Sequence, residues 1–264
     1  MAFFGIDVSE HNGYINWGKL KGKIDFAIIR AGYGKNHVDN KLIENINGCS
    51  SIGIPYGMYW YSYAYTEEMA VNEAKYICDI AKSYHPLYPI CFQWGSESEK
   101  YANGKNIFIS DAKRVSIARS FLDYIESHGH YAAIYCDKAY YNKGFSKLGK
   151  SYDIWFADWN AAAPGSPCTI WQSANTFSIN GITGNVNADI SYINYGALAS
   201  TKPKPITAGL TDEQKKTVLA ELEQDFWETY TDLAVKCKSG EYDKFMIEQL
   251  GYDYKVVAAV VKVI

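Results

Sequence analysis

Short apolar runs alternate with amphipathic stretches over residues 1–198. A run of four to eight apolar residues bounded by turn residues is typical of a buried strand, whereas apolar residues at every third or fourth position indicate a helix. Strands are predicted at Phe3–Val8, Phe26–Arg30, Gly57–Tyr61, Tyr88–Trp94, Ala132–Cys136, Ile154–Asp158 and Thr169–Gln172. Helices are predicted at Asn40–Ser51, Glu67–Ser83 and Asp111–Ser127. This alternation predicts the α/β class with a parallel sheet.

The pattern changes after about residue 130, where strands become more frequent and helices fewer. We therefore expect an irregular TIM-like βα barrel that degenerates in its second half. In such barrels the functional side chains lie at the carboxyl ends of the strands. Asp7, Gln93 and Asp158 all stand at predicted strand ends.

The last quarter of the chain has a different character. Residues 200–209 contain two prolines, small residues and lysines, which is typical of a semi-rigid linker. Thr211 is followed by acids and then by a helical apolar stripe, so it is a candidate helix N-cap. The predicted organisation is a barrel at 1–199, a linker at 200–209 and a small all-helical module at 210–264.

Composition narrows the function classes. With 48% hydrophobic residues, 21% charged residues and a net charge of −3, the chain can bury a core and has no basic footprint for nucleic acid. The aromatic content of 16% fits either core packing or a sugar-binding groove, in which flat rings stack on sugar faces. Neither the histidines nor the six cysteines show metal-ligand spacing, so no metal or other cofactor is expected, and the cysteines are interpreted as mostly buried thiols.

The ends of the chain bear on localisation. The first residues lack the basic and apolar regions of a secretory signal, and the apolar stretch Val256–Ile264 is short and interrupted by Lys262. We therefore expect synthesis in the cytoplasm without a signal peptide and no membrane partner. Delivery to any extracellular target would need another route.

Four segments, taken in order, resemble the family 25 glycoside hydrolases, which are muramidases (lysozymes) of phages and bacteria. They are Gly5-Ile6-Asp7-Val8-Ser9, Asp25 to Gly34 (DFAIIRAGYG), Gly57 to Tyr63 (GMYWYSY) and Ile154 to Trp159 (IWFADW), the last followed by Trp171-Gln172. The resemblance covers residues 3 to about 196. It implies a flattened βα barrel with a groove at the strand ends, which cleaves the β-1,4 bond between N-acetylmuramic acid and N-acetylglucosamine without a cofactor.

The acids that such chemistry needs are altered. Glycoside cleavage uses one protonated carboxyl group as a donor and a second carboxylate to stabilise the sugar cation or assist attack. The family pattern places an Asp-x-Glu pair after an apolar strand, and Gln93 and Gly95 occupy those positions here. A further family acid is replaced by Asn187, with Asp189 at the later polar position, so Asp7 is the acid that survives.

Other readings of these positions stay open. Glu97 is a candidate displaced acid, although it and Glu99 are more simply interpreted as solvated loop residues. Asp7 itself could cap a turn. Arg30 could pair with a groove acid or with a muramyl carboxylate. Candidate sugar-stacking residues, each as readily core as groove, are Tyr33, Tyr61, Tyr63, Tyr135, Trp159 and Trp171.

The helical module at 210–264 resembles, over about 35 residues, a small cell-wall-binding repeat of phage lysins. The Gly251-Tyr252-Asp253-Tyr254 turn carries this resemblance, whereas Glu241 to Lys244 (EYDK) depart from the repeat's pattern. The resemblance implies binding to peptidoglycan fragments. A helical appendage for docking or oligomerisation is the alternative.

Three functions follow from these observations. The first is a peptidoglycan-binding protein on a muramidase fold with impaired or lost catalysis, acting at a bacterial cell wall or within a phage or bacteriocin particle. The second is an active endolysin that uses Asp7 with a displaced acid. The third is a structural or interaction protein with a vestigial groove, which makes its contacts through 210–264.

Overall fold

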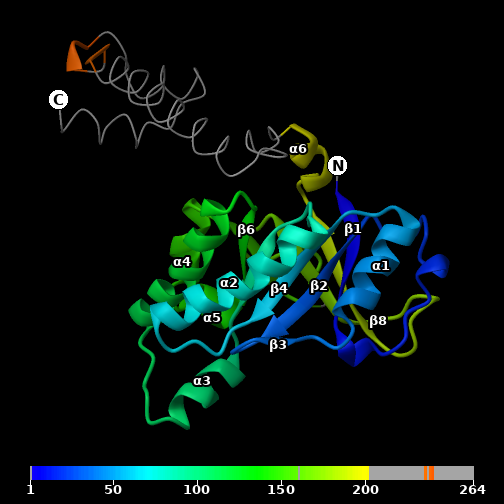
Figure 1. The fold of residues 1–264 in the computed structure, drawn as a ribbon, viewed down its shortest axis with the longest axis horizontal. Helices are drawn as coiled ribbons and strands as arrows, with labels where there is room; N and C mark the ends of the chain where they lie inside the picture. Colours follow the sequence, from blue (N-terminus) through cyan, green and yellow to red (C-terminus); the bar gives the residue numbers. More distant parts are fainter. Residues whose placement is uncertain (1, 160, 202–234, 237, 241–264) are drawn as a thin grey trace, which may run out of the picture. The chain divides into compact units, whose positions relative to one another are not determined.

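The computed structural model describes residues 2–159, 161–201, 235, 236 and 238–240. The chain divides into two compact units, Met1–Thr201 and Lys202–Ile264 (Figure 1). The predicted module at 210–264 lies outside the described residues apart from the five named above. Most of the predicted linker lies outside them too, although helix α6 (Tyr195–Thr201) extends two residues into the range 200–209.

The first unit is built on a nine-stranded sheet whose order is β1-β9-β8-β7-β6-β5-β4-β2-β3. A further pairing of β1 with β2 closes the sheet into a barrel, and β3 remains outside as the second strand of a hairpin with β2. The strands are β1 Phe3–Val8, β2 Phe26–Tyr33, β3 His37–Val38, β4 Tyr56–Tyr61, β5 Ile90–Gln93, β6 Ala132–Asp137, β7 Asp153–Ala157, β8 Ile170–Phe177 and β9 Val186–Ser191. The predicted βα barrel is confirmed.

The second half of the barrel is irregular, as the sequence predicted. Pairings from β1 through β2, β4, β5, β6 and β7 to β8 are parallel, but β9 runs antiparallel to both of its neighbours. Strand β9 was not predicted because it alternates Val186 and Ala188 with the polar residues Asn187 and Asp189, so it contains no apolar run. Polar side chains at these alternate positions share one face of the strand with each other.

Helices cover the outside of the barrel and follow the predicted amphipathic stretches. Helices α1 (Leu42–Ile52), α2 (Glu67–Tyr84) and α4 (Asp111–Ser127) match them within two residues at each end. Thr66 and Ser110 cap α2 and α4 by accepting backbone N–H groups, which explains the sharp starts. Helices not predicted are α3 (Ser96–Asn103), α5 (Lys138–Asn142) and α6, with 3-10 helices at Glu10–Asn12, Trp17–Lys19 and Phe145–Lys150.

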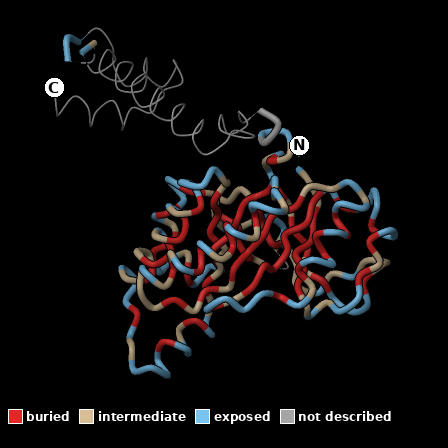
Figure 2. Tube along the Cα trace, viewed as in Figure 1, coloured by how far each residue is buried: buried red, intermediate tan, exposed pale blue. Residues whose placement is uncertain are grey.

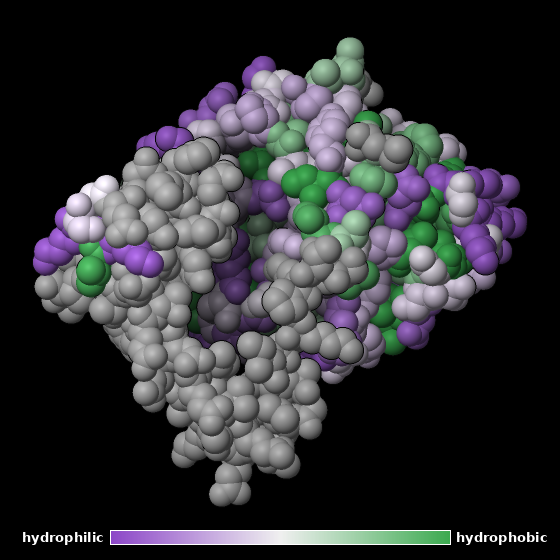
Figure 3. Space-filling view, turned by 90° about the horizontal axis from the view of Figure 1, so that it is seen from above, coloured by the Kyte–Doolittle hydropathy of each residue, from purple (hydrophilic) through white to green (hydrophobic). Residues whose placement is uncertain are grey.

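Burial separates the strands from the outer surface of the helices. Figure 2 shows buried residues concentrated along the strands and on one side of each major helix. On the face of the molecule shown in Figure 3, hydrophilic and hydrophobic residues of the described part are interspersed. The five cysteines in the described part of the chain are free, and Cys49, Cys78, Cys91 and Cys136 are buried, as expected for structural thiols. No described helix combines the length and apolarity needed to cross a bilayer.

Candidate functional site

Asp7 lies near the carboxyl end of β1 and is 5% exposed. Its Oδ2 accepts a hydrogen bond from Gln172 Nε2 at 2.6 Å, and its Oδ1 accepts one from Asn187 Nδ2 at 3.0 Å. The antiparallel register places Asn187 of β9 directly opposite Asp7. The two amides therefore hold both carboxylate oxygens in a fixed orientation at the barrel end.

A second carboxyl group lies beneath this one. Asp189 is fully buried two residues along β9 from Asn187, and its Oδ1 accepts a hydrogen bond from Trp155 Nε1 at 2.8 Å. Burial raises the pKa of Asp7 to about 6, against the opposing effect of hydrogen bonds from Asn187, Gln172 and Asp189. Burial, followed by the charge of Asp7, raises the pKa of Asp189 well above its usual value.

These two buried acids influence each other's titration, because the charge of Asp7 raises the pKa of Asp189. Two adjacent buried carboxylates cannot both ionise at neutral pH, so one retains its proton. Asp189 Oδ2 accepts no hydrogen bond from any N–H or O–H group of the described residues, so a proton on this carboxyl group can serve the bond to Asp7. The sequence did mark Asp189 as polar, but only the pairing of β9 with β1 shows that it is coupled to Asp7.

Gln172 connects Asp7 to the aromatic residues of the barrel end. Its Oε1 accepts hydrogen bonds from Tyr135 Oη and from Trp159 Nε1, each at 2.9 Å, while its Nε2 donates to Asp7. Tyr135 and Trp159, both predicted as sugar-stacking residues, are thereby brought to Asp7. Gln172 was part of the Trp171-Gln172 motif but was not selected as a site residue from the sequence.

Removal of the Gln172 amide should make Asp7 a weaker acid. In Gln172→Ala we expect the pKa of Asp7 to rise above 6 by on the order of one pH unit, because a hydrogen bond that favours the carboxylate is lost. Carbon-13 NMR titration of the aspartate carboxyl groups measures this pKa. Ser173→Ala, the neighbouring change in β8, is the matched control and should leave the titration unchanged.

Gln93 is the last residue of β5, and Gly95 lies two residues beyond it. Gln93 is half-buried and aligns with Tyr61 of β4 and Tyr135 of β6. Gly95 has an extended backbone that any residue adopts, yet a Cβ built there would lie 2.7 Å from Tyr61 Oη. The Tyr61 hydroxyl therefore fills the space that a side chain at position 95 needs.

Glu97 and Glu99 belong to helix α3, which corrects their interpretation as loop residues. Gly95 is the N-cap of this helix, which begins at Ser96 soon after the end of β5. The helix was not predicted because its sequence is mostly polar and shows no apolar periodicity. Glu97 pairs with Lys100 at 2.5 Å and its side chain is 57% exposed. Glu99 pairs with the buried Arg114 of α4. Burial raises the pKa of Tyr61 and Tyr63, and the charge of Glu97 adds to the rise in both.

Three of the predicted tyrosines form a continuous aromatic row. The rings of Tyr61 and Tyr63 have centroids 5.3 Å apart, and the Tyr63 ring meets Tyr33 edge-on at 6.3 Å. Tyr33 and Tyr61 each end a strand, so the row lies along the carboxyl edge of β2 and β4. Together with Trp159, which is 45% exposed, these half-buried rings offer surfaces on which a sugar can stack.

Arg30 serves a separate ion-pair network. Its Nε donates to Asp39 Oδ2 at 2.6 Å and its Nη2 donates to Glu10 Oε1 at 2.7 Å. The guanidinium group also lies 5.5 Å from the centroid of the Tyr33 ring. Arg30 thus pairs with these two acids, which the sequence did not single out, and supports one end of the aromatic row.

Trp171 of β8 and Asp158 make hydrogen bonds that stabilise the loop after β7. Trp171 is 6% exposed and donates from its Nε1 to the Asp158 carbonyl at 2.9 Å, while Asp158 Oδ2 accepts the Gly165 amide. Strand alternation places Trp171 on the opposite face of β8 from Gln172. The structure therefore does not bring Trp171 to Asp7 with the other candidates.

Comparison with known proteins places this geometry in a family. The family model for glycosyl hydrolases family 25 matches residues 6–182. The chain belongs to glycoside hydrolase family 25. Its barrel is thus the peptidoglycan-hydrolase fold of the lysozymes, and the residues at the carboxyl ends of its strands lie where the family's groove is expected.

Individual relatives agree with this assignment. Lysozyme M1 of Streptomyces globisporus is 25% identical over 206 residues, which cover 69% of this chain and 65% of the relative. The modular autolysin LytC of Streptococcus pneumoniae is 28% identical with a TM-score of 0.62 over 72% of this chain and 47% of LytC, and it has also been solved with a synthetic peptidoglycan ligand. The chain thus spans less than two thirds of either relative. An endolysin catalytic domain from a Listeria monocytogenes bacteriophage shares the fold, with 19% identity and a TM-score of 0.63 over 75% of this chain and 97% of that domain.

Within this family 25 barrel, the positions at which the resemblance predicts acids lie at different distances from Asp7. Asn187 contacts Asp7 directly, whereas Gln93 stands on β5, across the barrel order from β1. Positions 93 and 95, at which the family resemblance predicts a pair of acids, hold an amide and a glycine, and Tyr61 Oη lies 2.7 Å from the Cβ position of the glycine.

Proposed function

We propose that this family 25 chain binds the glycan strands of peptidoglycan in its barrel-end groove and has lost most or all of its hydrolytic activity. The observation that carries this proposal is the Tyr61 hydroxyl 2.7 Å from the Cβ position of residue 95. An enzyme that retained its acid at this position would need that space for a carboxyl side chain.

The remaining groups support binding rather than cleavage. Asp7 has both carboxylate oxygens engaged by Gln172 and Asn187, so it is held as an acceptor with limited freedom to attack or donate. The aromatic row and Trp159 provide stacking surfaces, and such contacts are independent of any acid. The relatives named above are cell-wall lytic proteins, and LytC has been solved with a peptidoglycan ligand. On this proposal the chain acts at a bacterial cell wall, alone or within a phage or bacteriocin particle, and residues 210–264 add wall binding or docking.

One observation favours residual hydrolysis as the second candidate. The raised pKa of Asp7, about 6, leaves a fraction of this group protonated near neutral pH, as a general acid requires. A retaining or inverting mechanism would still need a second carboxyl group facing the sugar, and Glu97 is the acid offered for it.

A paired assay on purified peptidoglycan separates the two candidates. We expect the protein to sediment with insoluble peptidoglycan while turbidity and reducing ends stay at background. Trp159→Ala should release much of the bound protein because an exposed stacking ring is lost, at about 1 kcal/mol or roughly fivefold in affinity. Tyr14→Ala, a change at an exposed ring of the loop before Ile15, is the control. Wall clearing at rates typical of lysozymes would favour the active endolysin instead.

A further inference from the structure

A pocket of about 370 Å³ lies beside the aromatic row, outside the groove described above. Its wall consists mainly of the tyrosines Tyr63, Tyr65, Tyr76 and Tyr101, which come from the segment after β4 and from helices α2 and α3. The Tyr101 ring lies 5.2 Å from that of Tyr63 and 6.4 Å from that of Tyr65. The rings are tilted against one another and form an aromatic corner.

A buried carboxyl group completes this pocket. Glu73 of α2 lines it and is 3% exposed. Its Oε1 accepts the Tyr63 amide at 3.0 Å, but its Oε2 is buried with no hydrogen-bond partner among the described residues. A buried acceptor without a donor costs free energy, so a ligand that donates to this atom would satisfy it. Burial raises the pKa of Glu73 to about 7, against the opposing effect of the Ser62 hydroxyl and the Tyr63 amide.

We propose that this pocket binds a primary ammonium group of a short peptide whose carboxylate lies close by, as in the zwitterionic end of a diamino acid. Tyrosine faces attract cations through the quadrupole of the ring, and Glu73 supplies the hydrogen-bond acceptor. The Lys105 ammonium group lies 5.7 Å from the centroid of the Tyr101 ring, so this ring already interacts with a cation. Lys105 itself is not among the residues that line the pocket. Lys35 does line it, and its positive charge favours a ligand that carries a carboxylate beside the ammonium.

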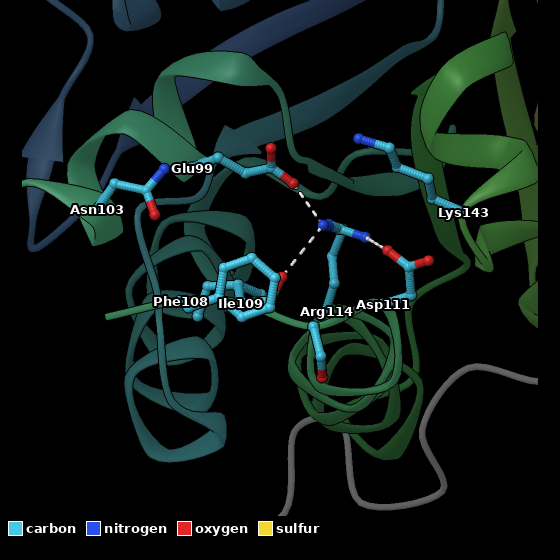
Figure 4. A pocket seen from close by; sticks show the side chains of 8 residues that line it. Glu99, Asn103, Phe108, Ile109, Asp111, Arg114 and Lys143 are labelled. Atoms are coloured by element: carbon cyan, nitrogen blue, oxygen red, sulfur yellow. Dashed lines mark hydrogen bonds and ion pairs between the residues drawn. The ribbon is translucent and has the colours of Figure 1, made fainter. Parts of the chain in front are cut away.

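Another pocket, of about 300 Å³, contains charged groups that are already paired with one another. It is lined by Glu99, Asp111, Arg114 and Lys143, with the exposed Phe108 at its side (Figure 4). Arg114 is buried, and its guanidinium group pairs with both carboxylates and with the Ile109 carbonyl. These charges compensate one another and brace α3 against α4.

This inference rests on the proposed peptidoglycan binding, since peptidoglycan combines glycan strands with short peptides. Tyr63 belongs both to the aromatic row and to the pocket, so the two surfaces are continuous. A glycan strand on the row would place its attached peptide within reach of Glu73. The chain would then bind the glycan strand and its attached peptide at the same time.

Calorimetric titration of the full chain with small peptides tests the pocket directly. The probes are an Ala-Glu-Lys tripeptide, the same peptide acetylated at the lysine Nε, and its carboxyl-terminal amide; glucosamine represents an amine borne by a sugar. We expect the free tripeptide to bind, acetylation to weaken binding at least about tenfold, and amidation to weaken it less. Glu73→Gln should weaken binding of the tripeptide about tenfold, and Tyr101→Ala about fivefold.

Tyr101→Ala tests the idea even where Glu73→Gln disturbs the buried loop, because Tyr101 is 43% exposed. Tyr14→Ala, at an exposed ring elsewhere, should bind like the parent. Equal binding of the acetylated peptide, tighter binding of glucosamine than of the tripeptide, or no binding of any peptide would each overturn the proposal. If peptides fail to bind while the protein still sediments with peptidoglycan, the pocket assignment is wrong and the groove assignment stands.

Discussion

The triple variant Gln93→Asp, Gly95→Glu and Tyr61→Phe is expected to cleave peptidoglycan at least about a hundredfold faster than the parent chain. General acid catalysis alone contributes about 10²–10⁴-fold, and residues two apart on an extended segment face the same side. The change at Tyr61 is needed because its hydroxyl lies 2.7 Å from the Cβ position of residue 95, whereas the next ring atom, Cζ, lies at 3.6 Å, an ordinary contact.

Release of reducing ends from purified cell walls measures this gain. Gln93→Asp with Gly95→Glu but with Tyr61 retained should recover less activity, since the new glutamate meets the hydroxyl. Tyr61→Phe alone should recover none. If the triple variant folds, binds walls and still releases no sugar ends, the groove lacks more than its acids and the barrel has diverged further.

Strands that a local apolar run defines could be predicted from the sequence, whereas a strand defined by remote pairing could not. Strand β1 was predicted with its observed bounds because an apolar run and a following turn define it locally. Strand β9 was missed because its inward positions are Asn187 and Asp189. In the sequence alone, such polar residues look like those of a loop. The irregularity of the second half was predicted, but the antiparallel return of β9 to β1 depends on contacts about 180 residues apart.

The candidate site likewise contains residues that the sequence predicted and residues that it did not. Asp7, Tyr135 and Trp159 were predicted as groove residues, and the structure joins them through Gln172. Asn187 was predicted from the family resemblance, and it bonds Asp7 directly. Gln172 stood in the Trp171-Gln172 motif, but its role was not predicted, because it lies in three hydrogen bonds to residues remote in sequence. The same is true of the Tyr61 hydroxyl over Gly95, since a steric overlap between β4 and the start of α3 appears only once both elements are placed.

The buried pair of Asp7 and Asp189 should make the barrel lose stability as the pH rises. In the folded chain both pKa values are raised, Asp7 to about 6 from an ordinary value near 3.8. Between these values the unfolded chain has released a proton that the folded chain retains, so the unfolded state binds fewer protons. A higher pH then favours unfolding, by about 1.4 kcal/mol for each pH unit and each such group. The stability present at pH 4 is therefore lost progressively towards neutral pH.

Asp189→Asn is expected to remove one of these contributions and to be more stable than the parent at pH 7, because the raised pKa of Asp189 no longer contributes. An asparagine cannot ionise, its Oδ1 can still accept from Trp155, and its Nδ2 can donate to Asp7 as the protonated acid does. Denaturant unfolding followed by tryptophan fluorescence from pH 4 to pH 8 measures the difference. Asp79→Asn, which changes an exposed acid of α2, should keep the parent's pH slope. Parallel slopes for Asp189→Asn and the parent would show that the two carboxyl groups do not influence each other's titration, and the hydrogen-bond arrangement around Asp7 would then need a different account.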